Sequence, residues 1–134
     1  MILNDKHLID LLNQDQAKEE IDTAYLDYFN IIKIKTTNIF DNIEFLSLRN
    51  NNIQNLDFLH LLPKLYYLDL RNNPIENIDN LHTHNTFGFL GLSIEKYSQK
   101  QITHLRRMNI GIFVLDKLEQ DYKKYIIINN PSII

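Results

Sequence analysis

The chain lacks cysteine and tryptophan and has only three glycines and three prolines among its 134 residues. Without cysteine there is no disulfide framework, no thiolate metal site and no thiol nucleophile. So few glycines and prolines argue against a collagen-like or low-complexity chain. The formal net charge is only −3, so the protein also lacks the concentrated basic charge that nucleic-acid binders and polybasic membrane anchors use.

Long hydrophobic runs are missing as well. No stretch approaches the ~20 apolar residues that a membrane-spanning helix needs. The first residues lack the basic head and apolar segment of a secretory signal, and no acceptor sequence for N-glycosylation occurs. We therefore expect a cytoplasmic protein without a membrane partner.

The sequence does contain an internal repeat. Residues 43–53 (IEFLSLRNNNI) and residues 65–75 (LYYLDLRNNPI) share the pattern L-x-x-L-x-L-x-x-N-x-I at a spacing of 22 residues. Successive side chains of a strand point to opposite faces, so both leucines of each L-x-L stretch point to the same side. One such unit cannot bury its apolar face alone, which predicts stacked coils.

This pattern resembles the leucine-rich repeat family in its 22-residue class. The resemblance implies an α/β fold, a short solenoid of about five coils with a concave parallel β-sheet and helical caps at both ends. In the family a ladder of asparagines supports the turn after each strand, and Asn51 and Asn73 match its position. The same frame predicts five inward-facing pairs of strand residues: Ala24/Leu26, Leu46/Leu48, Leu68/Leu70, Leu90/Leu92 and Ile112/Val114.

No linker divides the chain, so we expect one domain over residues 1–134. Residues 1–20 should form an amino-terminal capping helix with Asp5 as its N-cap, residues 21–115 the repeats, and residues 116–134 a carboxyl-terminal cap. A helix over residues 101–108 should cover the convex side. The interval 32–42 is the least regular and is expected to contain a loop.

The repeat frame also predicts which side chains the concave sheet presents to solvent. Neighbouring coils lie about 4.8 Å apart, so Phe45, Tyr67 and Phe89 should stack as an exposed aromatic row beside Arg49 and Arg71. Aromatic residues and arginine are enriched in protein interfaces. The candidate partner-binding residues are Tyr25, Asp27, Phe45, Ser47, Arg49, Tyr67, Asp69, Arg71, Phe89 and Phe113. Alternatively, a terminal loop covers some of the rings or the frame slips at Phe89, and the two arginines only pair with Asp27 and Asp69.

The leading hypothesis is a non-catalytic module that binds a protein partner on its concave face. It would serve as a small cytosolic inhibitor of the immunity-protein type or as an intracellular adaptor. The alternative is an RNA-binding or ribonucleoprotein scaffold component, which the negative net charge opposes. We expect no enzyme and no small-molecule substrate, because Ser47 has no histidine in the adjacent repeat positions to act as a base. We also expect no cofactor and no metal, because His82 and His84 alone are too few ligands.

Overall fold

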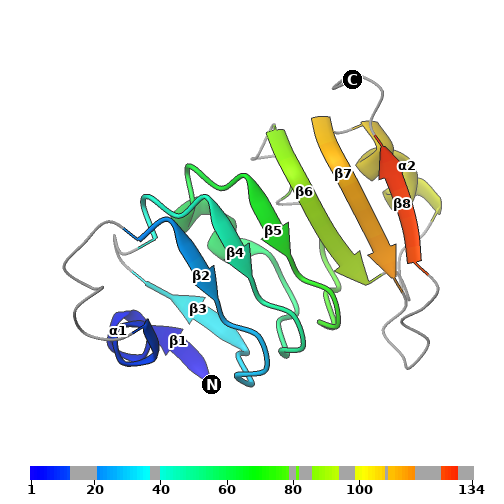
Figure 1. Cartoon of the computed structure of the whole chain (residues 1–134). Coiled ribbons are helices and arrows are strands. Elements are labelled where there is room, and N and C mark those ends of the chain that lie inside the picture. Colours follow the sequence, from blue (N-terminus) through cyan, green and yellow to red (C-terminus); the bar gives the residue numbers. More distant parts are fainter. Residues whose placement is uncertain are drawn as a thin grey trace.

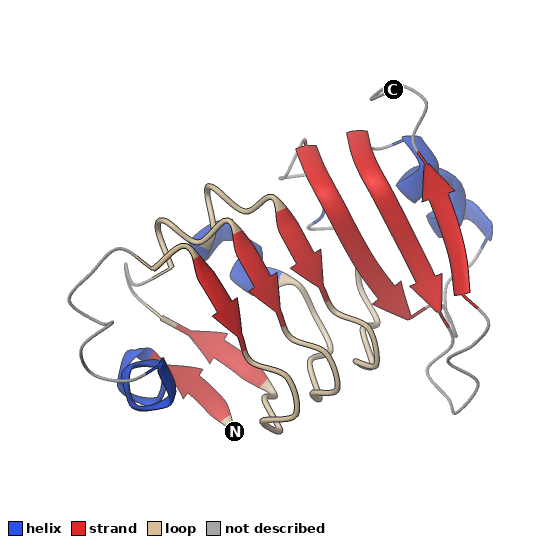
Figure 2. Ribbon diagram, in the orientation of Figure 1, coloured by secondary structure: helices blue, strands red, loops and turns tan. Residues whose placement is uncertain are grey.

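The computed structural model describes residues 1–12, 21–36, 40–78, 81, 86–93, 99–107, 109–116 and 125–129. Short strands follow one another side by side across the molecule (Figure 1). Figure 2 shows that loops make up most of the path between them. The elements are β1 (Ile2–Asn4), α1 (Asp5–Leu12), β2 (Thr23–Tyr25), β3 (Lys33–Lys35), β4 (Phe45–Ser47), the 3₁₀ helix η2 (Asp57–Leu61), β5 (Tyr67–Asp69), β6 (Thr86–Ser93), α2 (Gln99–Arg107), β7 (Asn109–Asp116) and β8 (Tyr125–Asn129).

The main sheet has the strand order β2-β4-β5-β6-β7-β8. Its first strands are parallel and keep the 22-residue spacing: Ala24 pairs with Leu46, Leu46 with Leu68, and Leu68 with Leu90. The spacing predicted from the sequence is therefore confirmed from β2 to β6. One face of this sheet covers the core, and we call the opposite face the open face.

The core lies between the sheet and the chain segments behind it. Leu46, Leu48, Leu68 and Leu70 have no exposed surface, as the repeat predicts for the two inward positions of each strand. The second apolar part of each repeat closes the core from behind, through Ile53, Leu56, Ile75 and Ile78. Burying apolar surface contributes about 25 cal/mol per Å², so this stack is the main source of stability in the described residues.

Asn51 holds the first two coils together. Its Nδ2 donates hydrogen bonds to the carbonyl oxygens of Leu26 and Leu48, each at 2.9 Å. Its Oδ1 accepts hydrogen bonds from the backbone N–H groups of Phe29 and Ile31, each at 3.0 Å. The side chain therefore satisfies buried backbone groups of its own coil and of the preceding coil.

Asn73 makes the equivalent bonds one coil further on. Its Nδ2 donates to the carbonyl oxygens of Leu48 at 2.8 Å and Leu70 at 3.1 Å, and its Oδ1 accepts from the N–H of Ile53 at 3.1 Å. The asparagine ladder that the family resemblance implies is thus present at both positions. Each asparagine serves the turn of the coil before it.

The amino-terminal end differs from the expectation of a helix over residues 1–20. The helix α1 covers only Asp5–Leu12, and the strand β1 precedes it. The side chain of Asn4, not that of Asp5, caps the helix, because the Asn4 Oδ1 accepts a hydrogen bond of 2.9 Å from the backbone N–H of His7. Residues 13–20 lie outside the described residues.

The interval 32–42 is not simply a loop, because it contains β3. This strand pairs in parallel with β1 in a separate two-stranded sheet behind the main one, with Leu3 opposite Ile34. Ile34 is buried between the exposed Lys33 and Lys35. Residues 37–39 of the interval lie outside the described residues.

The frame predicted for Ile112 and Val114 is wrong by one residue. Ile112 pairs with Phe89, and Phe113 pairs with Leu90, so the spacing here is 23 residues. The helix α2, which confirms the helix predicted over residues 101–108 up to Arg107, occupies the connection between β6 and β7. A helix has a smaller rise per residue than the extended segments of the earlier coils. The number of residues between paired positions of β6 and β7 therefore need not be 22.

The carboxyl-terminal cap expected over residues 116–134 differs in its described part. Asp116 is the last residue of β7, and β8 pairs with β7 in the antiparallel direction. The sheet is therefore mixed rather than fully parallel. Residues 117–124 and 130–134 lie outside the described residues, and so does the predicted cap helix. Among the described residues, no helix has the length and apolarity needed to cross a bilayer.

Candidate functional site

Four aromatic rings form a row along the open face, and we call Tyr25, Phe45, Tyr67 and Phe89 the aromatic row. The ring centroids of Phe45 and Tyr67 are 3.9 Å apart at an interplanar angle of 10°, and those of Tyr67 and Phe89 are 4.3 Å apart at 11°. Tyr25 contacts Phe45 at 5.2 Å with a tilt of 53°. The stacking follows from the register, which pairs Phe45 with Tyr67 and Tyr67 with Phe89.

The aromatic row remains open to solvent. Phe45, Tyr67 and Phe89 are half-buried, and the side chain of Tyr25 at the end of the row is 66% exposed. Phe45, Tyr67 and Phe89 cover one another's ring faces by stacking, and each keeps part of its surface exposed. None of the four rings is fully buried, and Phe89 pairs with Tyr67 at the 22-residue spacing, so the frame does not slip at Phe89.

A buried carboxylate stands beside the row. Asp69 is only 2% exposed, and Arg71 binds it with two hydrogen bonds, from Nε to Oδ1 at 2.9 Å and from Nη2 to Oδ2 at 2.7 Å. This bidentate geometry is the strong form of an arginine–carboxylate pair. Burial, together with the nearby Asp69 carboxylate, raises the pKa of the Tyr67 hydroxyl above 10.0.

Asp27 organises the polar groups of the neighbouring coil. Its Oδ1 accepts a hydrogen bond of 2.7 Å from the Ser47 hydroxyl and one of 2.8 Å from the backbone N–H of Arg49. Ser47 and Asp69 lie on the open face, as the sequence predicts, but both are buried. Ser47 and Asp69 therefore stabilise the open face through buried contacts and do not present an exposed group to solvent.

Arg49 is the most available charge of this network. Its side chain is 43% exposed, against 22% for Arg71. Its Nε lies 3.8 Å from the Asp69 carboxylate and has no hydrogen-bond partner. The second alternative, in which the arginines only pair with neighbouring acids, therefore fits Arg71 much better than Arg49.

Phe113 is not placed as the sequence predicted. Its backbone pairs with Leu90, which is buried, whereas the 22-residue frame paired Phe113 with Gly91. The side chain of Phe113 lies outside the described residues. The other nine candidate residues share the open face of β2, β4, β5 and β6 or the turns that follow these strands.

Gly91 lies where the repeat pattern places an outward side chain, and the missing side chain is expected from the sequence to relieve crowding on the sheet or to open a shallow notch. A Cβ atom on Gly91 would lie 2.7 Å from Asp69 Oδ1 and 3.3 Å from Arg71 Cγ. The missing side chain therefore leaves the room that this ion pair occupies, and it lets Arg71 lie above the Phe89 ring, 6.0 Å from its centroid.

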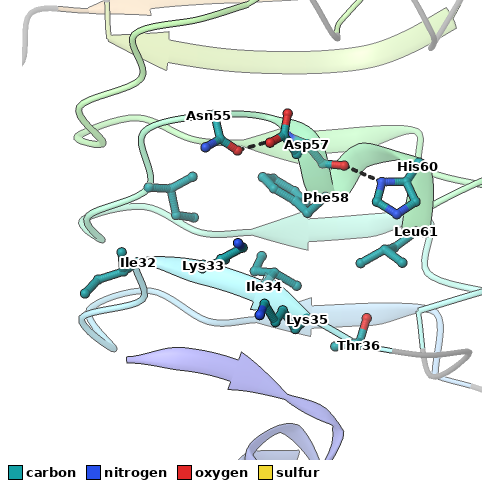
Figure 3. Close-up of a pocket in the computed structure, with 11 residues that line it drawn as sticks. Ile32, Lys33, Ile34, Lys35, Thr36, Asn55, Asp57, Phe58, His60 and Leu61 are labelled. Carbon is teal, nitrogen blue, oxygen red and sulfur yellow. Dashed lines mark hydrogen bonds between the residues drawn. The ribbon is translucent and has the colours of Figure 1, made fainter.

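A cavity behind the sheet was missed in the sequence (Figure 3). It measures about 370 Å³ and lies between β3 and η2. Its wall includes Ile34, Phe58, Lys33, Asp57 and Thr36, whose Oγ1 is buried without a hydrogen-bond partner. The alternation of Lys33, Ile34 and Lys35 was the signal for the strand that forms one wall, but nothing in the sequence marked the cavity itself.

Acidic residues and histidines do not gather into a metal site in the part of the chain that the structure describes. His82 and His84, the pair considered for metal binding, lie outside it. His60 contacts the backbone oxygen of Asp57 through its Nδ1. The arrangement that the described residues do bring together is a set of aromatic rings, one half-exposed arginine and a buried ion pair, which suits contact with another molecule.

Comparison with known proteins identifies the central coils. A family described as leucine rich repeats, in a two-copy model, matches residues 41–81, and these residues belong to the leucine-rich repeat family. No curated protein and no solved structure matches the chain. Leucine-rich repeat domains generally mediate protein–protein interactions and are generally non-catalytic.

Proposed function

We propose that the open face binds a protein partner through the aromatic row and Arg49. The observation that carries the proposal is the stacking of Phe45, Tyr67 and Phe89 into a row that remains partly exposed. The rings have little freedom to lose on binding, because each is held by its neighbours, and preorganisation reduces the cost of association. The partner would gain apolar burial from the rings and a charged contact from Arg49.

The buried ion pair supports this proposal by keeping the face rigid. Arg71 and Asp69 satisfy each other, and Ser47 and Asp27 do the same one coil earlier. The strands therefore present their side chains from a surface that needs no rearrangement. We propose that the protein acts in the cytoplasm without catalysis, as a small inhibitor of the immunity-protein type or as an intracellular adaptor.

The test is capture of partners from native cells, followed by reconstitution of each candidate complex from purified proteins. The test variant combines Tyr67→Ala with Arg49→Gln, because both side chains lie on the face and neither ties the fold together as Arg71 does. Removing Arg71 would take away both of its side-chain hydrogen bonds to the buried Asp69 carboxylate and leave only Arg49 at 3.8 Å, and the resulting loss of stability would confuse binding with unfolding. The control combines His60→Ala with Lys64→Gln, an exposed residue of η2 and an exposed residue of the turn between η2 and β5.

The proposal predicts that one purified partner binds the wild type and the control variant equally and loses affinity for the test variant, with unchanged circular dichroism. Equal binding of all three proteins would overturn the assignment of the face. Binding to a single-stranded RNA with a steep salt dependence, in place of a protein, would favour the ribonucleoprotein alternative instead.

A further inference from the structure

Exposed apolar side chains are concentrated in the first coil and the strand beside it. Among the large hydrophobic side chains that are exposed in the described part of the chain, only Tyr66 lies elsewhere. The others are Ile2, Tyr25, Tyr28, Phe29 and Ile32, with exposed fractions from 38% to 76%. Contiguous exposed apolar surface on a folded protein commonly marks an interaction site.

The same end of the molecule has a sheet edge on which no described strand lies. β2 is the outermost strand of the main sheet and pairs only with β4 among the described strands (Figure 1). The N–H of Leu26 donates to the carbonyl of Ser47 at 2.8 Å, and the carbonyl of Asp22 accepts from Phe45 at 3.0 Å, so these residues turn their backbone groups toward β4. Backbone groups alternate along a strand, and those of Thr23 and Tyr25 therefore point to this edge.

We propose that this edge pairs with the same edge of a second copy of the chain. The two β2 strands would run antiparallel about a two-fold axis at Ala24. Thr23 of one copy then lies opposite Tyr25 of the other, twice over, and the N–H and C=O groups that point outward form the hydrogen bonds of these two pairs. A two-fold contact uses the same patch on both copies, so a short self-complementary strand is sufficient to define it.

The side chains along the edge fit this register. Asp22 falls opposite Leu26 of the second copy, and Asp27 falls opposite Ile21, so no acid faces an acid across the contact. Like charges directly opposite each other would destabilise the pairing, and their absence favours a second copy over an acidic foreign strand. Ala24, at the axis, is small and buried toward the core, so it leaves the backbones free to approach.

Pairing at β2 would also enlarge the binding surface. Tyr25 is the last ring of the aromatic row, and in the dimer it would adjoin the Thr23 side chain of the second copy. The two open faces would then form one continuous sheet with an aromatic row on each side of the axis. The dimer does not depend on what the aromatic rows bind, so it can be tested independently of the proposed function.

The first experiment measures mass by sedimentation velocity across a concentration series. The wild type is expected to reach twice the mass of one chain as the concentration rises. Thr23→Pro removes one outward N–H and should abolish the dimer, whereas Thr23→Val, the matched control, should retain it. A wild type that stays monomeric at every concentration would overturn the proposal, and so would a Thr23→Pro protein that dimerises like the wild type.

The second experiment tests the register without introducing a proline. The chain has no cysteine, so Thr23→Cys with Tyr25→Cys introduces the only thiols. Residues in a hydrogen-bonded antiparallel pair have Cα atoms about 5.5 Å apart, which a disulfide can span. The double variant should therefore form a covalent dimer on mild oxidation.

Thr23→Cys alone is the control for this register. Its two thiols would lie diagonally across the axis, with Cα atoms about 8 Å apart, beyond the reach of a disulfide. Little covalent dimer is expected from this variant. Equal cross-linking of the single and double variants, or none of the double variant, would show that the edges do not meet in this register.

Discussion

The first coil and the two central coils follow the same backbone path with different sequences. β2 pairs with β4 in the same register as β4 pairs with β5, yet the family match covers only residues 41–81. The difference centres on one position: Asn51 and Asn73 occupy it in the central coils, and Phe29 occupies it in the first coil. The comparison shows why a coil can lose the consensus residue and keep the fold.

The direction of the hydrogen bonds explains the tolerance. Asn51 supports the turn of the coil before it, through the N–H groups of Phe29 and Ile31. Asn51 of the second coil therefore supports the turn of the first coil. No described coil precedes the first one, so no described turn needs an asparagine in place of Phe29. An asparagine ladder joins coils pairwise, so the first member of a stack can do without it.

The first coil contains a strained backbone position that the central coils lack. Asn50 and Asn72 have positive φ angles of 58° and 59°, a conformation that asparagine tolerates well. The equivalent residue of the first coil is Tyr28, which has a φ of 62°. A bulky side chain in this region is strained by roughly 1–2 kcal/mol. In the central coils, asparagine thus suits the positive φ angle at this position. In the first coil, the neighbouring segments keep Tyr28 in the same conformation despite the strain.

The largest expected effect on stability comes from truncating a core residue, and it should differ between the central coils and the first coil. Leu68→Ala should lower the free energy of unfolding by about 4 kcal/mol, because coils on both sides hold the cavity open. Leu26→Ala should cost only about 2 kcal/mol, because the end coil relaxes or opens locally. Urea denaturation of both variants measures the difference, and equal losses would mean that the end coil is as constrained as the centre.

Asn51→Ala should lower the free energy of unfolding by about 3 kcal/mol, because it leaves several buried backbone groups unpaired. The matched control is its exposed neighbour Asn52, whose side-chain Nδ2 donates to the Oδ1 of Asn30. Asn52→Ala should cost less than about 0.5 kcal/mol. Phe29→Asn should bring no comparable gain. A clear stabilisation by Phe29→Asn would contradict the one-directional ladder.

Gly91→Ala is expected to destabilise the protein by about 2 kcal/mol, since the new methyl group meets the buried Asp69 carboxylate. Gly88→Ala is the paired control. Its methyl group meets the ring of Tyr66, which is 59% exposed and can turn away, so the cost should be small. Thermal unfolding measures the loss of stability in each variant. A larger loss in Gly88→Ala than in Gly91→Ala would contradict the assignment of the rigid contact to Gly91.

Tyr28→Asn should stabilise the protein by about 1 kcal/mol, because asparagine accepts the positive φ that strains tyrosine. The same exchange in reverse, Asn72→Tyr, should be destabilising by a similar amount. Chemical denaturation measures both. If Tyr28→Asn lowers stability instead, the exposed tyrosine ring contributes more through its contacts than the backbone strain costs.

The smallest effect concerns pH. The pKa of Tyr67 is raised above 10.0 in the folded protein, chiefly by burial, and returns to its ordinary value on unfolding. The unfolded chain therefore loses this proton first as the pH rises, and the stability present below about pH 10 declines toward the folded pKa. Tyr67→Phe should decline less steeply in urea denaturation above about pH 10, and parallel curves would show that Tyr67 contributes nothing.

Most of the central architecture could be predicted from the sequence. The L-x-L pairs and the two asparagines recur at one spacing, and a strand with period two converts that spacing directly into inward and outward residues. The row of Phe45, Tyr67 and Phe89 followed from the same frame. The burial of Asp69 could not be predicted, because it depends on the space above Gly91 and on the way that Arg71 folds over it.

The ends of the stack were predicted less well for a physical reason. A capping element touches the repeats on one side only, so its sequence need not obey their spacing. β1 and β3 form a small sheet of their own, and the helix α2 changes the count before β7 to 23 residues.

The sequence by itself determined the repeat, its period and the inward leucines, since these follow from local periodicity, and the family resemblance implied the asparagine ladder. Only the tertiary structure decided which charges are buried, where the register shifts and which sheet edge no described strand covers. Those features depend on contacts between segments that no spacing rule connects.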